Sequence, residues 1–339
     1  MNRTQQGTDR KSFTQQYGEE LSPPLFILAP ARSFSSVVCA MIGQHPEMYG
    51  LPETNLLCYE TIKERAEQLT LSARLGWHPT HGLLRAIAEL YFGRQTATTI
   101  RLARQWLRMR SNVTTADVFK LLADKVCPRT LVEKSPGTAN SIQSYGSIQA
   151  KFPRARFIHL LRHPRGYGDS VMKAINDRQR RKPLPSTHWL LRTASYNPYR
   201  TNSPGKTKDK ALDPQHWWYV KNQEIKEFLR SVPCNQQMRV RGEDLLGDSD
   251  THLYAIAKWL GLRTDAVGIE MMKHPERSPY AFLGPPGGRF GNDRLFLSDP
   301  TLDSSRTMTK GLDGPLTWCN NDQGFTPQVK ALAREFGYK

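Results

Sequence analysis

Two strand-length apolar stretches, each followed by a polar loop and a helical pattern, constrain the fold of this chain most strongly. Residues 25–29 (LFILA) and 157–161 (FIHLL) are its most apolar segments. Both are far shorter than the roughly 18 residues that a membrane span needs, so we expect no membrane span. Helical patterns at 37–43 and 165–175 follow the two stretches, and strands that alternate with helices favour a parallel sheet. We therefore predict an α/β fold with a central, mainly parallel sheet and helices on both faces.

The rest of the pattern divides the chain into segments. Residues 1–21 are polar and lack an apolar core of the signal-peptide kind, so we expect a flexible tail and no secretory signal. A domain over 22–339 should contain two insertions. Residues 77–127 have helical patterns, and residues 178–214 form a basic loop rich in Pro, Ser, Thr and Asn, of a length that is usually functional. Residues 273–325, rich in Gly, Pro and Asp, should form an extended surface wrap.

Charge and cysteine usage narrow the function classes. The chain has 48 Lys and Arg against 31 Asp and Glu, a formal net charge of +17, which predicts an anionic partner without naming it. The odd number of cysteines and the absence of CxxC pairs argue against zinc motifs and a disulfide framework, and favour a reducing cytoplasm. The cysteines are Cys39, Cys58, Cys127, Cys234 and Cys319.

The loop after the first strand is a candidate anion site. It reads PARSFSS over residues 30–36 and precedes a helix, whose N-terminal N–H groups and dipole attract anions. Arg32 adds a planar cationic fork, and Ser33, Ser35 and Ser36 add hydroxyl donors. A capped helix with a surface arginine is the plainer alternative. A Walker A loop is excluded because its glycines and its Lys-Ser/Thr pair are missing.

A second candidate anion site follows the later strand. Arg162 lies at the predicted carboxyl end of this strand, and ligands of open α/β sheets bind at such ends. Ser170 falls about two turns along the following helix. Together the two side chains could hold a second phosphate, whereas either one alone would more often be structural or solvated.

These segments carry a family resemblance. RSFSS after one strand, RHPRGYGDS after a later strand, and RGEDL before a helix ending in WLGL resemble the sulfotransferases that use 3′-phosphoadenosine 5′-phosphosulfate, PAPS. The resemblance extends from about residue 24 to the C-terminus. It implies a single P-loop-like domain, PAPS as cosubstrate and adenosine 3′,5′-bisphosphate as product. We also expect no metal, because the sequence has no metal-ligand spacing.

The resemblance also implies roles for individual residues. The family's 3′-phosphate motif falls on Arg162 and Ser170, and Lys134 in EKSP matches a lysine near the transferred group. Lys310 and Gly311, with Trp318, are similar to a segment that closes over the nucleotide. The 5′-phosphosulfate loop falls on Arg32, Ser33, Phe34, Ser35 and Ser36.

The sequence departs from the family pattern at two places. Phe34 stands where the family usually has glycine, so we expect a loop that does not freely adopt a positive φ there and has an altered geometry. Three residues separate Gly314 from Trp318, rather than the usual one, which puts the position of Trp318 in doubt.

Glu53 is the candidate catalytic base. It follows a predicted strand end at Gly50 and Leu51, and a glutamate in this neighbourhood faces the acceptor hydroxyl in the glycan-modifying and polyketide-associated members that the chain resembles. The alternative is that Glu53 only supports a helix beginning at Thr54, since acids favour that end of the dipole. Four histidines could replace it as base. They are His78, His81, His188 and His216.

The sequence thus favours sulfuryl transfer from PAPS by in-line displacement, with Arg32, Lys134 and Glu53 as the catalytic residues. A P-loop-type nucleotide kinase and a non-catalytic polyanion-binding protein are the alternatives. We expect a hydroxyl-bearing acceptor, either a small molecule or a carrier-bound chain, and no nucleic acid, since RNA-binding and helix-turn-helix patterns are missing. The acceptor's identity and the oligomeric state do not follow from the sequence.

Overall fold

A parallel sheet forms the centre of the protein. The computed structural model describes residues 22–74, 79–137, 142–181, 213–307, 311–319 and 322–339. Its five described strands are all parallel and lie in the order β2–β3–β1–β4–β5. They are β1 (Leu25–Leu28), β2 (Met48–Gly50), β3 (Thr130–Glu133), β4 (Arg156–Leu161) and β5 (Gln237–Arg241). With helices on both faces, this sheet confirms the predicted α/β fold.

The two apolar stretches of the sequence are neighbouring central strands. β1 pairs with β4, with Leu28 opposite His159, and on its other side with β3, where Phe26 is opposite Glu133. All four residues of β1 are buried, as expected for a strand covered on both faces. Even His159 is fully buried, and burial lowers its pKa to about 3, so it is neutral and bonds Asn222 through Nε2 at 3.0 Å.

The chain connections create a topological switch point at the ends of these two strands. β1 continues through α2 (Ser35–Gly43) to β2, beyond β3, whereas β4 continues through α8 (Pro164–Arg181) and α10 (Pro214–Leu229) to β5 on the opposite side. The connections therefore leave β1 and β4 in opposite directions. Open α/β sheets bind ligands at such a switch point, outside the carboxyl ends of the strands.

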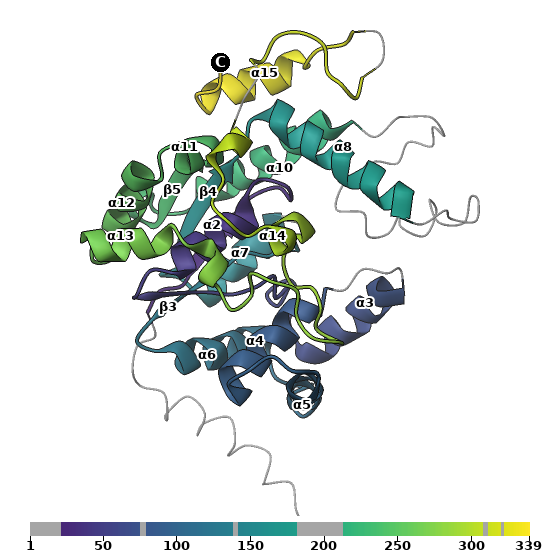
Figure 1. Ribbon diagram of the computed structural model, residues 1–339, viewed down its shortest axis with the longest axis vertical. Coiled ribbons are helices and arrows are strands. Elements are labelled where there is room, and N and C mark those ends of the chain that lie inside the picture. The colour runs from purple at the N-terminus through teal and green to yellow at the C-terminus, as the bar shows by residue number, and fades with distance from the viewer. Residues whose placement is uncertain (1–21, 75–78, 138–141, 182–212, 308–310, 320–321) are drawn as a thin grey trace, which may run out of the picture.

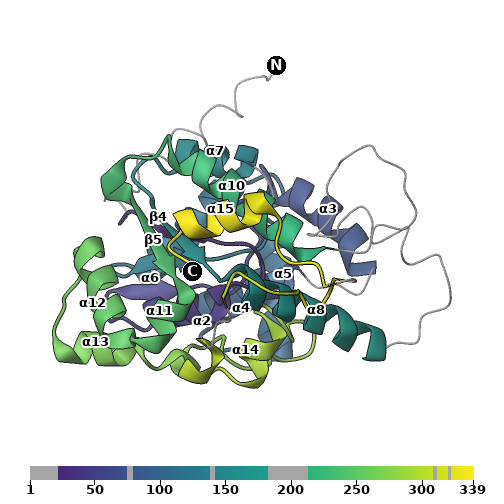
Figure 2. The same cartoon turned by 90° about the horizontal axis from the view of Figure 1, so that it is seen from above.

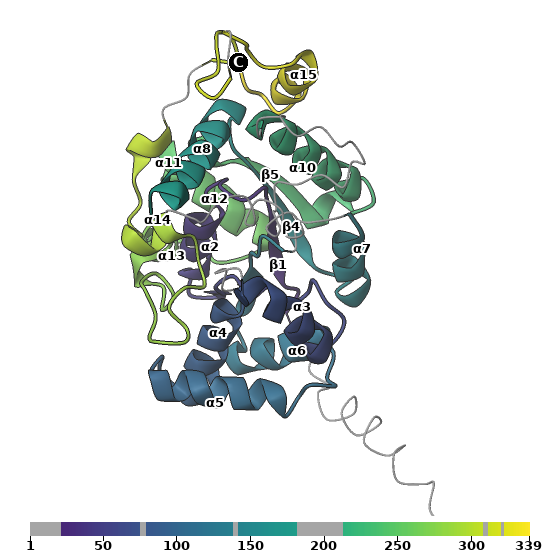
Figure 3. The same ribbon diagram turned by 90° about the vertical axis from the view of Figure 1, so that its right-hand side faces the viewer.

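Helices cover each face of the sheet. Figure 3 shows α7 (Ile142–Lys151) and α10 on one side, and α2 and α13 (Ala266–Met272) on the other. Each side has its own buried apolar cluster: Tyr145 and Ile225 belong to the first, while the second combines α2 with α12 (Ser249–Leu260) and α13. β5 is preceded by a short 3₁₀ helix, η3 (Cys234–Gln236), and is followed directly by α11 (Gly242–Gly247).

Helices also form most of the segment predicted to be helical at 77–127. α4 (His81–Phe92), α5 (Ala97–Arg108) and α6 (Thr115–Val126) gather with α3 (Ile62–Arg74) at one end of the molecule (Figure 1). Their buried apolar side chains join the cluster on the α7 side. The basic segment 178–214 is described only at its two ends, in α8 and α10. Residues 1–21 lie outside the described part of the chain.

The C-terminal segment is more than the extended surface wrap expected from its composition. It contains α14 (Arg294–Ser298) and two 3₁₀ helices, η4 (Pro275–Arg277) and η5 (Ser304–Thr307). It also contributes buried side chains such as Tyr280, whose hydroxyl lies 2.9 Å from that of Tyr49.

The last helix closes the fold at the other end of the molecule from α4–α6. α15 (Pro327–Glu335) packs on α10 in an apolar cluster with Trp218 and Phe336 (Figure 2). Within the described residues, no helix is long and apolar enough to cross a membrane.

Candidate active site

The loop between β1 and α2 has an unusual backbone. Arg32 has a φ of 76° and Phe34 a φ of 61°, in the left-handed region that few non-glycine residues adopt. Phe34 is the N-cap of α2 and provides no side-chain hydrogen bond to the helix start. The buried hydroxyl of Ser33 has no hydrogen-bond partner among the described residues. A partnerless hydroxyl beside a helix N-terminus fits an anionic oxygen of a ligand.

The expectation for Phe34 is wrong. It adopts the positive φ that a glycine would adopt, at a cost of about 1–2 kcal/mol for a residue with a Cβ. Its ring has partners that offset this cost. The guanidinium of Arg162 lies 4.1 Å from the ring centroid, and Gly242 faces the ring where any Cβ would come within 2.5 Å of Cδ2.

The structure brings together the two predicted anion-binding loops. Arg162 donates through Nη1 to the backbone oxygen of Arg32 at 2.6 Å, and Arg32 donates through Nε to the hydroxyl of Ser170 at 3.2 Å. Burial lowers the pKa of Arg162 to about 10, so its guanidinium keeps its charge at neutral pH. Two cations and one hydroxyl therefore face the switch point between β1 and β4.

A third loop, after β3, adds Lys134. Its side chain is 4% exposed, and Nζ donates to the hydroxyl of Ser36 at 2.9 Å and to the carboxylate of Glu53. Lys134 thus connects the β1–α2 loop with the candidate base. The Glu53 side chain is 21% exposed and is therefore accessible from outside.

The alternative role for Glu53, as support for a helix start, is wrong. The helix begins at Ile62, and Glu53 lies in a loop whose backbone N–H donates to the oxygen of Gly291 at 2.6 Å. Of the four histidines, His78 and His188 lie outside the described residues. His81 accepts the N–H of Phe290 at Nδ1, and His216 is exposed.

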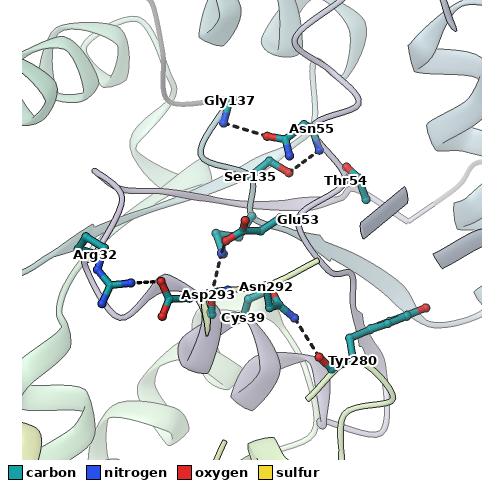
Figure 4. A network of polar contacts seen from close by, with 12 residues as sticks. Arg32, Cys39, Glu53, Thr54, Asn55, Ser135, Gly137, Tyr280, Asn292 and Asp293 are labelled. Atoms are coloured by element: carbon teal, nitrogen blue, oxygen red, sulfur yellow. Dashed lines mark hydrogen bonds and ion pairs between the residues drawn. The ribbon is translucent and has the colours of Figure 1, made fainter. Parts of the chain in front are cut away.

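A buried polar network ties the Glu53 loop to the Lys134 loop (Figure 4). Glu133, at the end of β3, is 1% exposed and accepts the hydroxyls of Thr54, at 3.1 Å, and Ser135. Ser135 in turn accepts the N–H of Asn55 at 2.9 Å. Burial raises the pKa of Glu133 to about 7. Glu133 has no role predicted from the sequence, although its place beside Lys134 at a strand end is a signal.

Asp293 is a second residue that sequence reasoning missed. Its carboxylate forms an ion pair with Arg32, and its N–H donates to Ser36 at 3.3 Å (Figure 4). The neighbouring Asn292 donates to the oxygen of Tyr280 at 3.2 Å, which fixes this part of the chain. No motif surrounds Asp293, so only the fold identifies it as part of the site.

The residues expected to close over the nucleotide are only partly described. Lys310 lies outside the described residues. Gly311 is exposed, and its oxygen accepts from Nε of Arg165 at 3.2 Å, near the start of α8. Trp318 packs against Gly168 of the same helix, and its Nε1 donates to Asp213 at 3.3 Å. The segment thus lies against the helix that carries Ser170.

The described residues contain no group of three or more His, Cys, Asp or Glu side chains placed to hold a metal ion. Arg32, Arg162 and Lys134 supply positive charge to the site.

Comparisons with known proteins agree with this geometry. A model of the sulfotransferase family matches residues 23–266, which is most of the chain, so the protein belongs to the sulfotransferase family. This membership confirms the resemblance seen in the sequence and indicates sulfuryl transfer. No curated protein sequence matches closely enough to count as a relative.

Two solved structures share the fold over nearly the whole chain. One is the sulfotransferase domain from the curacin biosynthetic pathway, with a TM-score of 0.70 and 21% identity, covering 94% of this chain and 99% of that one. The other is the sulfotransferase domain of the Synechococcus PCC 7002 olefin synthase, with a TM-score of 0.67 and 23% identity, covering 95% and 97%.

Proposed function

We propose that this protein transfers a sulfuryl group from PAPS to the hydroxyl of an acceptor. The observation that carries the proposal is the position of Lys134, which contacts both Ser36 in the anion loop and the carboxylate of Glu53. A cation that joins a phosphate-type loop to a carboxylate is what transfer of an anionic group to a hydroxyl requires.

The residues present fit the donor. Among the residues that the structure describes, neither the buried Ser33 hydroxyl nor the buried Nε of Arg162 has a hydrogen-bond partner, so both have hydrogen-bonding capacity left for an anion. The β1–α2 loop would hold the 5′-phosphosulfate through Arg32, Ser33, Phe34, Ser35 and Ser36. Arg162 and Ser170 would hold the 3′-phosphate, and Lys310 and Gly311 would lie over the nucleotide. When bound, PAPS supplies the sulfuryl group and a phosphate leaving group.

The catalytic roles follow from charge and position. Arg32 and Lys134 would stabilise negative charge as it develops on the leaving oxygen and the sulfonate oxygens. Glu53 would accept the proton of the acceptor hydroxyl at its carboxylate, for which its partial exposure leaves room. We propose direct in-line transfer without a metal and without a covalent enzyme intermediate.

The acceptor would reach Glu53 from the side of α4–α6. Gly82, in the first turn of α4, packs on the backbone of Glu53, which places this helical segment next to the candidate base. The two similar domains come from a biosynthetic pathway and an olefin synthase. For this protein we propose a hydroxyl-bearing acceptor, either a small molecule or a carrier-bound chain. The cysteine usage of the sequence, an odd number without CxxC pairs, supports a cytoplasmic location.

A ligand panel tests the proposal. Thermal shift and calorimetry with adenosine 3′,5′-bisphosphate, ATP and NAD should show binding of the first and much weaker binding of the other two. Labelled PAPS and a panel of hydroxyl acceptors should then yield a sulfated product, with turnover unchanged by EDTA. Preference for ATP would favour a kinase. Salt-sensitive binding of nucleic acid without affinity for the bisphosphate would favour a polyanion-binding protein.

A further inference from the structure

Phe34 combines a strained backbone with a specific side-chain contact. Its φ of 61° costs a residue with a Cβ free energy that glycine would not lose. Such strain persists only where the surroundings impose it, and it gathers at sites of ligand binding. The contacts of the Phe34 ring should therefore account for the strained backbone.

The ring lies in a place shaped for it. A Cβ on Gly242 would meet Cδ2 of Phe34 at 2.5 Å, so α11 leaves room for the ring only because its first residue is glycine. The ring also faces the guanidinium of Arg162, 4.1 Å from the centroid. A cation over an aromatic face at this distance is attracted by the ring quadrupole.

Within the described part of the chain, few groups stabilise the charge of the buried Arg162 guanidinium. Nη1 donates to the backbone oxygen of Arg32, but the buried Nε has no hydrogen-bond partner among the described residues. Removal from water disfavours its charged form, which is the largest cause of its lowered pKa. A ring face stabilises the desolvated cation without occupying its N–H groups, so these stay directed to a ligand.

We propose that Phe34 is a positioning residue for recognition of the 3′-phosphate: its ring holds the Arg162 guanidinium in place, and Gly242 provides the space for the ring. The inference rests on the proposed function, in which Arg162 binds the 3′-phosphate of the donor. It assigns to the aromatic side chain a task distinct from that of the anion loop in which its backbone lies.

The test separates the 3′-phosphate from the rest of the nucleotide. Calorimetry on the full chain compares adenosine 3′,5′-bisphosphate with adenosine 5′-monophosphate, which lacks only the 3′-phosphate. Phe34→Leu keeps apolar volume but loses the aromatic face, and should bind the bisphosphate about 3- to 30-fold more weakly, with a clearly smaller loss of affinity for the monophosphate. Phe34→Tyr keeps the face and should preserve both affinities.

Two further variants separate a loss of nucleotide preference from a loss of stability. Phe34→Gly removes the backbone strain together with the ring, so its thermal midpoint should stay near wild type while the preference for the bisphosphate falls. Gly242→Ala should lower the same preference by displacing the ring, and it should have little further effect in the Phe34→Gly background.

The outcomes distinguish this inference from the proposed function. If the wild type binds neither nucleotide, the proposed function fails. If the wild type prefers the bisphosphate and Phe34→Leu keeps the full preference, the role of the ring is overturned. An equal loss for both nucleotides would also overturn it, because the ring would then support the anion loop and not Arg162.

Discussion

Lys134 and Glu53, which lie in loops after different strands, form an ion pair at the centre of the site. The same ammonium donates to Ser36 at 2.9 Å, so the side chain that would face the donor also holds the carboxylate that would face the acceptor. Removal of either residue leaves the other without its ion-pair partner. We therefore expect replacement of Glu53 and replacement of Lys134 to change kcat and donor affinity in different ways.

Replacement of the candidate base should separate turnover from donor binding. Glu53→Gln keeps the shape of the side chain but cannot accept a proton, so kcat should fall about 10²- to 10⁴-fold. Affinity for adenosine 3′,5′-bisphosphate should stay nearly unchanged, as measured by calorimetry. Glu60→Gln, at an exposed position, is the matched control. A wild-type kcat in Glu53→Gln across pH would move the search for the base to the four histidines.

Replacement of Lys134 should impair both steps. Lys134→Met removes the charge beside Ser36 and leaves Glu53 without its cation, so we expect a large loss of kcat together with weaker binding of the bisphosphate. Steady-state kinetics with labelled PAPS measures the first effect and calorimetry the second. Lys120→Met, in a surface ion pair, should change neither. Loss of affinity with normal kcat would contradict a catalytic role.

Arg162→Ala should weaken binding of adenosine 3′,5′-bisphosphate by about 1.5–3 kcal/mol, the range for a hydrogen bond to a charged group. Ser170→Ala should cost less, because its hydroxyl is neutral. The exposed Arg230→Ala serves as a control for the loss of one positive charge. Equal affinities of Arg162→Ala and wild type for the bisphosphate would remove the main support for this nucleotide site.

Asp293 should oppose donor binding. Its carboxylate pairs with Arg32, so an anionic donor must compete with it for the same guanidinium. Asp293→Asn keeps the backbone N–H that donates to Ser36 but removes the competing charge, and should bind the bisphosphate several-fold more tightly in calorimetry. Weaker binding would show instead that Asp293 orders Arg32 for its ligand. The control is Asp250→Asn, because the Asp250 side chain is exposed and forms a surface ion pair with Lys273.

Glu133 should make stability depend on pH. Its pKa rises from 4.5 to about 7 on folding because the carboxyl is buried, so between these values the folded state binds more protons than the unfolded state. The free energy of unfolding therefore falls as pH rises through this window. Urea unfolding at several pH values should show Glu133→Gln gaining stability relative to wild type from about pH 4.5 to about pH 7. A difference between the two proteins that is independent of pH would contradict this titration.

The sequence predicted well what depends on short segments. Four consecutive apolar residues in β1 specify a buried strand, and the same reasoning located β4. Because parallel strands end at the same edge of a sheet, the loops that follow them could be expected to meet, and Arg32 and Arg162 do. These features depend on local composition and on general rules of connection.

The helix expected from Thr54 shows where local pattern misleads. Thr54 looks like a helix cap, but its hydroxyl donates to Glu133, and the next N–H donates to Ser135. The helix begins only at Ile62. Glu133 and Ser135, about 80 residues away, accept the hydrogen bonds that a helix start at Thr54 would have used. Leaving the buried Glu133 carboxyl without these donors would cost more free energy than losing a helix cap.

By itself, then, the sequence determined the main strand–helix order and located the two candidate anion-binding loops, because a few neighbouring residues carry those signals. The tertiary structure alone decided which side chains meet: Asp293 with Arg32 across 261 positions, and Phe34 with Gly242 and Arg162. Such pairs have no periodicity and no fixed spacing in the chain. They form because the packing of the whole sheet and its helices brings distant loops to one edge, where charge and shape select the contacts.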